Sequence, residues 1–519
     1  MHRRTMMLVL AIAMLAISLP AVAELQNVTV GGEIRIRANY YTSTYSDTAE
    51  ISWPNFFLPA RPIGGFFGNN VVTIFDWSDK GNDFDNVEQR TRLNVNADFT
   101  DEVSAFIELD SYDVWGEDFQ SNYITGADFN DDSSTDVEVY QAYIQAQEMW
   151  GTPLQLRVGR QELEFGNEWL VGTNDTAAGF PGLSFDAVRL TYATDMFSVD
   201  AWAAKLNEVG AFEEDGDTDF YGVYGSYTGM ENISIDAYWM LLRDAASIND
   251  TANTFLPEWI ENWLGIDDYD PTYLHTVGLR GAGTIDAFDF NAEVAYQFGD
   301  ADSIGSTFAP FTYGDDDAEF DAWGGNLEVG YTFDMNYKPR VYIGGAYFGG
   351  EDNRDLSFFE WLNPFDMPEA SVSFNRLFSN WEYTEFFENT DLSNAWVARA
   401  GVSASPVESV DLLLAVSYFQ SLENFDAPRY MKIGNFRVPL NPTWSFWTEE
   451  NDDYIGTEVG LYATYHYSED LTFNAGWAHL FVGEGLEEGN FNAANGLLFT
   501  GGTGSDDADY LFLESILRF

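Results

Sequence analysis

The sequence contains no cysteine, so neither a disulfide framework nor a thiol-ligated metal site is possible. Basic side chains are scarce: 23 Lys and Arg stand against 85 Asp and Glu, which gives a formal net charge of −62. This balance argues against nucleic acid as a partner bound through general electrostatics. After Ala23, no apolar run reaches about 18 residues, which excludes a membrane-spanning helix.

The N-terminus has the features of a secretory signal peptide. A basic head at residues 2–4 precedes an apolar run at 6–19 and the small-x-small sequence Ala-Val-Ala at 21–23. The run is too short to span a bilayer comfortably. We therefore expect residues 1–23 to be removed and residues 24–519 to form one domain.

Aromatic residues make up 17% of the chain, and the hydrophobic residues are scattered rather than grouped, as in strand-rich proteins. In the segment 28–41, Val30, Ile34 and Ile36 point to one face, while Glu33 and Arg35 point to the other. Alternation of this kind over about 9–11 residues is typical of a transmembrane β-strand, with one face toward lipid and the other toward the lumen.

The alternation predicts 18 strands, at 28–41, 86–99, 103–113, 136–148, 153–164, 184–194, 196–206, 218–230, 232–243, 272–284, 286–299, 319–334, 337–349, 394–405, 407–420, 454–468, 470–482 and 508–519. Short turns such as Thr194-Asp195 alternate with long loops. We therefore predict an all-β fold: a transmembrane, antiparallel up-and-down β-barrel with short periplasmic turns and long extracellular loops. An even strand count places both termini in the periplasm.

The last strand supports this prediction. Leu513, Leu517 and Phe519 lie on one face, whereas Glu514 and Arg518 lie on the other. A terminal aromatic on the lipid face resembles the signal that is read by the outer-membrane barrel assembly machinery. We expect the protein in the cell outer membrane, in contact with lipid and lipopolysaccharide and inserted by that machinery.

Charged residues on the inward face are the clearest indication of function. Charge is tolerated inside a barrel and is costly against mid-bilayer lipid. Because alternate residues of a strand face opposite sides, their positions along the strands (their parity) assign eight arginines to the lumen: Arg35, Arg37, Arg90, Arg92, Arg157, Arg189, Arg280 and Arg399. Seven acids share that side: Glu33, Glu88, Glu108, Asp110, Glu293, Glu328 and Glu458. The arginines either pair with these acids or form a ladder that guides an anionic solute. The arginines on 28–41 and 86–99 are expected to form one positive patch.

Most of the acid surplus falls in the long loops. The run Asp315, Asp316 and Asp317 offers oxygen ligands that suit calcium, although solvated surface charge is the simpler interpretation. Beyond a structural calcium ion, we expect no cofactor. Two loops carry aromatic clusters, one around Trp53 and one around Trp259, which could stack on sugars or pack over the barrel mouth.

Catalytic residues are not apparent in the sequence. His275, His466 and His479 are dispersed, with no second histidine at metal-ligand spacing and no serine nucleophile motif. We therefore do not expect an enzyme.

The block Leu156-Arg157-Val158-Gly159-Arg160-Gln161-Glu162-Leu163-Glu164-Phe165-Gly166 resembles the alginate-export porin family, whose motif reads close to LRVGRQEL-x-[YF]-G. Further similar stretches include Gln89-Arg90-Thr91-Arg92-Leu93 and Gly476-Trp477-Ala478-His479. The residues that match the family motif in this sequence are Gly159, Arg160, Gln161, Glu162 and Gly166. It implies an 18-strand monomeric barrel with an arginine-lined constriction that passes an acidic polysaccharide.

These observations predict a passive outer-membrane channel for a polar, anionic solute. The more specific form of this prediction is the export of an acidic polysaccharide such as alginate. A cation-preferring general porin is one alternative. A structural or adhesion barrel with acidic, cation-binding loops is the other.

Overall fold

A computed structural model describes residues 25–45, 82–116, 121–122, 127–128, 137–175, 180, 182–208, 217–245, 271–300, 319–350, 373–386, 392–423, 426–428, 430–433, 436–439, 448–450, 452–485, 491–493, 498–500 and 507–519. The predicted signal peptide, residues 1–23, lies outside these ranges. Within the described chain, no helix is long and apolar enough to cross a membrane.

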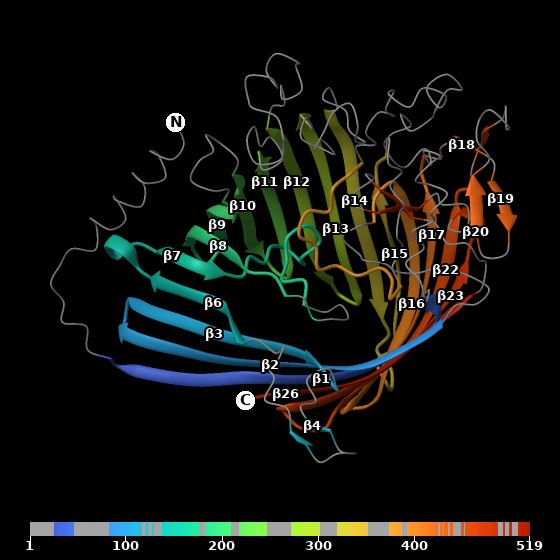
Figure 1. Ribbon diagram of the computed structural model, residues 1–519. Coiled ribbons are helices and arrows are strands. Elements are labelled where there is room, and N and C mark those ends of the chain that lie inside the picture. Colours follow the sequence, from blue (N-terminus) through green and yellow to red (C-terminus); the bar gives the residue numbers. More distant parts are fainter. Residues whose placement is uncertain are drawn as a thin grey trace.

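One closed sheet of 18 antiparallel strands forms the molecule (Figure 1). The strands are β1 (Asn27–Tyr45), β2 (Asn82–Thr100), β3 (Val103–Val114), β6 (Val137–Ala146), β7 (Leu154–Gln161), β8 (Phe185–Ala193), β9 (Phe197–Asn207), β10 (Thr218–Met230), β11 (Ile233–Asp244), β12 (Thr272–Ile285), β13 (Phe288–Asp300), β14 (Glu319–Thr332), β15 (Arg340–Phe348), β16 (Ala395–Val407), β17 (Val410–Ser421), β22 (Tyr454–His466), β23 (Leu471–Val482) and β26 (Ala508–Arg518).

Short two-stranded ribbons and one 3-10 turn lie outside this wall. They are β4 (Ser121–Asn122) with β5 (Ala127–Asp128), β18 (Asp426–Pro428) with β21 (Thr448–Glu450), β19 (Tyr430–Ile433) with β20 (Phe436–Pro439), β24 (Phe491–Ala493) with β25 (Leu498–Thr500), and the turn η2 (Met149–Gly151).

The two ends of the chain close the barrel. Strand β1 pairs on one side with β2, where Glu33 lies opposite Arg92, and on the other with β26, where Glu33 lies opposite Arg518. The backbone of Phe519 exchanges two hydrogen bonds with Gly32, at 2.9 and 3.1 Å. Every wall strand therefore has two neighbours, and the wall has no free edge.

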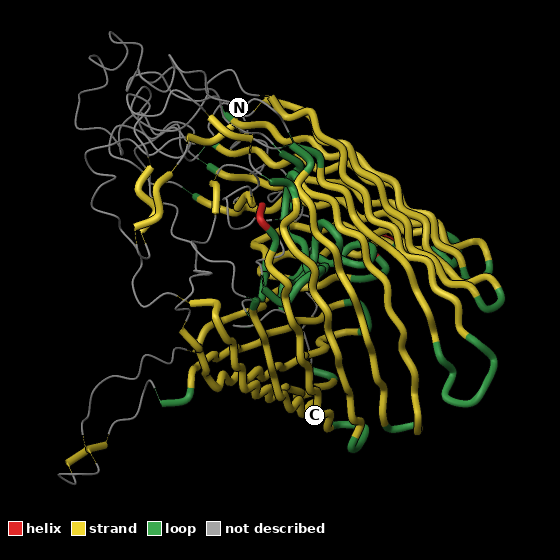
Figure 2. Tube along the Cα trace, turned by 90° about the vertical axis from the view of Figure 1, so that its right-hand side faces the viewer, coloured by secondary structure: helices red, strands yellow, loops and turns green. Residues whose placement is uncertain are grey.

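The predicted all-β, 18-strand antiparallel barrel is confirmed. Several strand boundaries differ from the prediction by a few residues, and in one case a turn replaces the expected start of a strand. The segment predicted at 337–349 begins only at Arg340, since Phe333 bonds to Pro339 and Lys338 to Met335 across a compact turn. Figure 2 shows short turns of this kind closing neighbouring hairpins at one end of the barrel.

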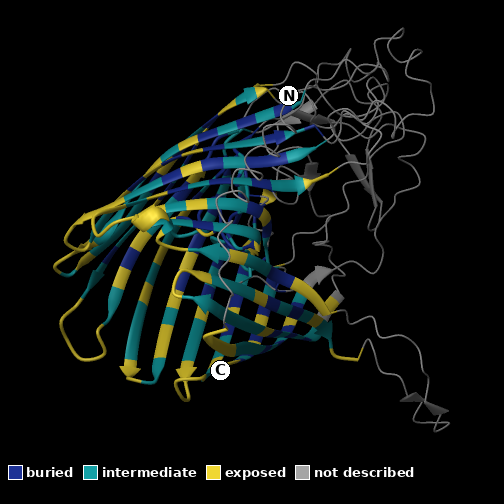
Figure 3. Cartoon of the chain, turned by 90° about the vertical axis from the view of Figure 1, so that its left-hand side faces the viewer, coloured by how far each residue is buried: buried dark blue, intermediate teal, exposed yellow. Residues whose placement is uncertain are grey.

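The outer surface has the pattern of a membrane wall. Exposed and buried residues alternate along the strands, which Figure 3 shows as bands of colour. Leu327, Ile343 and Leu513 are exposed in the apolar middle band. Exposed aromatic residues cluster toward the two ends of the strands, with Trp239, Trp323, Tyr347 and Trp477 toward one end and Phe197, Phe288, Tyr337, Tyr465 and Phe519 toward the other. Two aromatic girdles around an apolar band are characteristic of transmembrane barrels.

Candidate functional site: the constriction inside the barrel

The described parts of two connections lie inside the barrel. Inner loop 1 follows β7 and is described over 162–175, 180 and 182–184; inner loop 2 precedes β16 and is described over 373–386. Both carry side chains with almost no exposed surface, such as Trp169 and Leu170 in the first and Phe374 and Tyr383 in the second. The inner loops therefore fill part of the lumen with a packed core.

The family motif turns the chain from the wall into the lumen. Gly159 has φ +131°, and a Cβ there would lie 2.2 Å from the carbonyl oxygen of Ala142 on β6, so no larger residue fits without strain. Gln161 is fully buried and donates to the carbonyl oxygens of Gly159 and Ala187, at 3.2 and 3.0 Å. These bonds fix the end of β7, which stops at Gln161 rather than at the predicted residue 164.

Other motif residues have separate structural roles. Arg160 points to the outside of the barrel and forms a double hydrogen bond with Asp186, at 2.9 and 3.0 Å. Gly166 has φ +63°, and a Cβ there would meet the Tyr224 hydroxyl at 2.9 Å and Arg280 Cδ at 3.1 Å. The motif therefore stabilises the path of inner loop 1 across the lumen.

The two inner loops bind each other. Val171 and Phe378 form a parallel bridge, and Phe378 donates to the carbonyl of Leu170 at 2.8 Å. The Asn380 side chain donates to Glu168 Oε2 at 2.6 Å. Trp169 Nε1 donates to the Tyr383 hydroxyl at 3.0 Å. The loops thus form a single constriction element.

Four predicted arginines, Arg35 and Arg37 on β1 and Arg90 and Arg92 on β2, lie together on the inner wall. The guanidinium carbons of Arg35, Arg37 and Arg90 lie 4.2, 5.2 and 5.5 Å from the ring centre of Phe180, which belongs to inner loop 1. All four arginines are buried. Sequence parity predicted their neighbourhood but not the aromatic ring that covers them.

Carboxylates accompany each of these arginines. Glu514 on β26 lies 2.6 Å from Arg35 and 2.9 Å from Arg37. The remaining short contacts are Arg90–Glu33 at 2.6 Å, Arg92–Asp110 at 2.9 Å, Arg92–Glu108 at 3.6 Å, and Asp175 of inner loop 1 with Arg90 at 3.2 Å and with Arg92 at 3.3 Å. Burial of a guanidinium is costly unless it is paired. The expected positive patch is therefore a charge-compensated network.

The other predicted arginines lie elsewhere on the inner wall. Arg189 pairs with Asp200 at 2.9 Å, and Arg280 with Asp236 at 2.6 Å. Arg157 stands opposite Arg189 and donates to Gln145 at 2.9 and 3.1 Å. Arg399 donates to the backbone of Glu382 at 3.0 Å. In the part of the chain that the structure describes, Arg157 and Arg399 have no carboxylate within 4.0 Å.

The remaining predicted acids also point inward. Glu88 accepts from Asn39 at 2.7 Å. Glu293 accepts from Tyr238 at 2.8 Å, and Glu328 pairs with Arg340 at 2.8 Å. Glu458 anchors inner loop 2 by accepting from the Thr384 hydroxyl at 2.6 Å and from the Glu385 backbone at 3.1 Å.

Inner loop 2 holds a second concentration of acid. Burial and the neighbouring carboxylates Glu382 and Glu458 raise the pKa of Glu385. Desolvation, together with carboxylate neighbours, likewise raises the pKa of Glu162 in inner loop 1. In both cases burial is the main cause of the shift, and the neighbouring carboxylates add to it.

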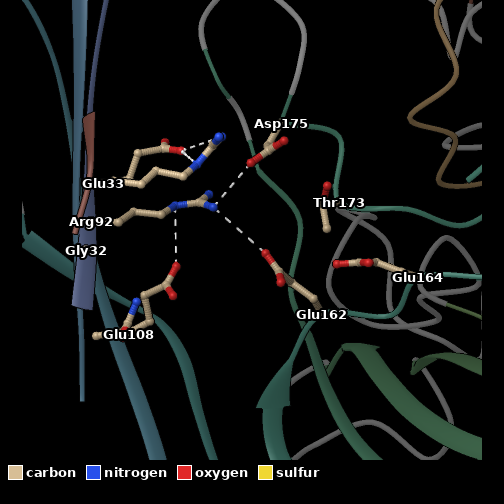
Figure 4. A pocket seen from close by; sticks show the side chains of 10 residues that line it. Gly32, Glu33, Arg92, Glu108, Glu162, Glu164, Thr173 and Asp175 are labelled. Carbon is tan, nitrogen blue, oxygen red and sulfur yellow. Dashed lines mark hydrogen bonds and ion pairs between the residues drawn. The ribbon is translucent and has the colours of Figure 1, made fainter. Parts of the chain in front are cut away.

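A pocket of about 360 Å³ lies between inner loop 1 and the wall formed by β1, β2 and β3 (Figure 4). Five carboxylates and two guanidinium groups line it, so its formal charge is negative. The lining residues are Gly32, Glu33, Arg92, Asn94, Glu108, Glu162, Glu164, Thr173, Asp175 and Arg518.

Sequence reasoning missed inner loop 1, including Asp175 and Phe180, and missed Glu514 as a site residue. A signal for the loop was present, because the apolar run Leu170-Val171-Gly172 would be unusual in a loop exposed to water. The expected calcium ligands Asp315, Asp316 and Asp317 lie outside the described residues, as do the aromatic clusters around Trp53 and Trp259. Among the described residues, no group of three or more His, Asp or Glu side chains is arranged to hold a metal ion.

The closed wall, its aromatic girdles and the internal constriction define a porin-like membrane β-barrel. The family model for alginate export matches residues 77–498, and the chain belongs to that family. No curated relative matches the sequence.

Solved structures with a similar shape are more distant. OccK1 (OpdK) of Pseudomonas aeruginosa is 9% identical, with a TM-score of 0.49 and coverage of 94% of this chain and 98% of that one. OccD3 (OpdP) of the same organism is 11% identical, with a TM-score of 0.48 and coverage of 96% and 93%. OccAB2 of Acinetobacter baumannii is 11% identical, with a TM-score of 0.48 and coverage of 96% and 100%.

Proposed function

We propose that the protein is a passive outer-membrane channel for small polar solutes and that its constriction prefers cations. The observation that carries the proposal is the charge compensation of the β1–β2 arginines by Glu33, Glu108, Asp110, Asp175 and Glu514. Because these arginines already have carboxylate partners, they have little remaining capacity to attract a passing anion. The pocket beside them keeps a carboxylate surplus, and rings of acidic side chains favour cations.

The location in the outer membrane is part of the proposal. An apolar band between two aromatic girdles supports insertion in a bilayer. The terminal Phe519, paired to the first strand, supports recognition by the barrel assembly machinery. The closed wall without a free edge is consistent with a monomer.

An anionic solute, including an acidic polysaccharide such as alginate, is the second candidate. Its support is the family to which the chain belongs and the facing pair Arg157 and Arg189, of which Arg157 has no carboxylate within 4.0 Å among the described residues. Against export of a long polyanion stands the packed constriction, which combines two inner loops with a negative pocket.

Swelling of liposomes that contain the purified protein distinguishes the candidates. Equal osmotic loads of arginine hydrochloride and sodium glutamate are compared, with raffinose as a neutral reference. If the channel prefers cations, the liposomes swell faster in the arginine salt. If it prefers anions, they swell faster in the glutamate salt. An adhesion barrel without an open pore leaves the liposomes unchanged in all three solutes, which would overturn the proposal.

A further inference from the structure

One carboxylate in the pocket differs from the other four because no arginine or lysine of the described chain lies within 4.0 Å of it. Glu33 contacts Arg90 and Arg518, while Glu108, Glu162 and Asp175 lie 3.6, 3.9 and 3.3 Å from Arg92. Glu164 has neither an ion pair nor a side-chain hydrogen bond to any described residue. Figure 4 shows it apart from the dashed network that surrounds Arg92.

The position of Glu164 is fixed by its neighbours in the chain. Leu163 on one side is fully buried, and Phe165 on the other stacks on Trp202 at 4.5 Å and on Tyr224 at 5.0 Å. These contacts hold inner loop 1 against the β9–β10 side of the barrel. Glu164 is exposed between them and lines the pocket that faces β1–β3.

We propose that solute passes through this pocket and that Glu164 is the residue that sets its preference for cations. The inference rests on the proposed channel function and adds the path and the residue. In a narrow passage, a charge acts over about one Debye length, or roughly 8 Å at physiological salt. The other four carboxylates of the pocket each lie within 4.0 Å of an arginine, which offsets part of their charge. Glu164 has no such contact among the described residues, so its charge acts on a passing ion without an offset from an ion pair.

The first test replaces Glu164 with glutamine and measures the K⁺/Cl⁻ permeability ratio of single channels in a planar bilayer. A unit charge about 6 Å from the path of an ion changes its local concentration roughly threefold in a water-like dielectric. Because the same charge lowers the local concentration of Cl⁻ by a similar factor, Glu164→Gln should lower the K⁺/Cl⁻ ratio by roughly tenfold. Glu102→Gln is the matched control, because Glu102 lies exposed in the tight turn between β2 and β3.

The second test changes the charge after folding, so that a folding defect cannot mimic the result. The chain has no cysteine, so Glu164→Cys introduces a single thiol. A trimethylammonium methanethiosulfonate reagent should shift the permeability ratio toward chloride. A sulfonate methanethiosulfonate reagent should restore the preference for potassium. Glu102→Cys should react with both reagents and leave the ratio unchanged.

The outcomes separate this inference from the channel proposal. If the wild-type protein does not conduct, the channel function itself fails. If the wild type conducts and prefers K⁺, while Glu164→Gln has the wild-type ratio, Glu164 does not set selectivity. If the thiol of Glu164→Cys does not react in an open pore, the pocket is not on the solute path. Either of the last two results overturns the inference alone.

Discussion

Glu514 is the residue on which the compensation of two arginines depends. Its Oε1 atom lies 2.6 Å from Arg35 Nε and 2.9 Å from Arg37 Nε, and Oε2 accepts from Asn474 at 2.9 Å. Glutamine at this position keeps one acceptor oxygen and loses the charge. We therefore expect Glu514→Gln to leave two buried guanidinium groups without an ionised partner on β26.

The size of the effect follows from burial. Glu514, Arg35 and Arg37 are only 5%, 7% and 7% exposed, so water cannot replace the lost contact. Removing one partner of a buried ion pair costs about 3–5 kcal/mol. Glu208→Gln is the control: its contact with Lys205 is 3.7 Å long, Glu208 is largely exposed, and Lys205 keeps Asp217 and Asp219. A surface pair of this kind is worth roughly 0–1 kcal/mol.

Urea unfolding in detergent micelles, followed by tryptophan fluorescence, measures the two free energies of unfolding. The same Glu514→Gln pore should shift its reversal potential toward anions, because two arginines lose compensation. A loss of stability no larger than that of Glu208→Gln, with unchanged selectivity, would refute the argument. In that case the Arg35–Glu514–Arg37 contacts would not govern the charge of the inner wall.

Three further outcomes are expected. Trp169→Ala removes a fully buried ring from between the inner loops and should lower the free energy of unfolding by about 3–5 kcal/mol. The single-channel conductance should become larger and noisier, and wild-type conductance would show that the loops do not limit flow. Deletion of Phe519 removes its two backbone bonds to Gly32 and should reduce the heat-modifiable, membrane-inserted fraction on gels; normal insertion would contradict the role of the terminal residue. Desolvation and neighbouring carboxylates raise the pKa of Glu164, so cation preference should decline as the pH falls from 7, starting above the usual glutamate range. Glu164→Gln should have a flatter profile, and identical profiles would assign the titration to another group. The charged groups that act on Glu164 are Glu162, Glu168, Asp175 and Arg189.

The wall of the barrel could be predicted from the sequence because alternation has a period of two residues and the membrane enforces it on every strand. The predicted segment 218–230 coincides with β10, and 454–468 differs from β22 only at its end. The turn before Arg340 was missed because Phe333, Met335 and Tyr337 continue the alternation through residues that are not in a strand.

The site was harder to predict from the sequence, since the residues that contact one another there lie far apart in the chain. Parity placed Arg35 and Arg90 on one face, and pairing of consecutive strands brought them together. Glu514 reaches Arg35 only because β26 closes the barrel, 479 residues away in sequence. Asp175 reaches the same cluster only because inner loop 1 folds inward. No local pattern encodes either contact. The sequence therefore raised the question of whether the arginines are paired with carboxylates, but it could not answer that question.

The most direct test of the central claim is the reversal potential of the wild-type pore in a planar bilayer under a KCl gradient. Because the arginine cluster is compensated and the pocket beside it is acidic, we expect the reversal potential at moderate salt to have the sign of a cation-selective pore. Raising the salt should weaken the preference, because screening shortens the reach of the pocket charges. A potential of the opposite sign at moderate salt would contradict the account. It would mean that the arginines remain available to anions and that the anionic-solute function holds.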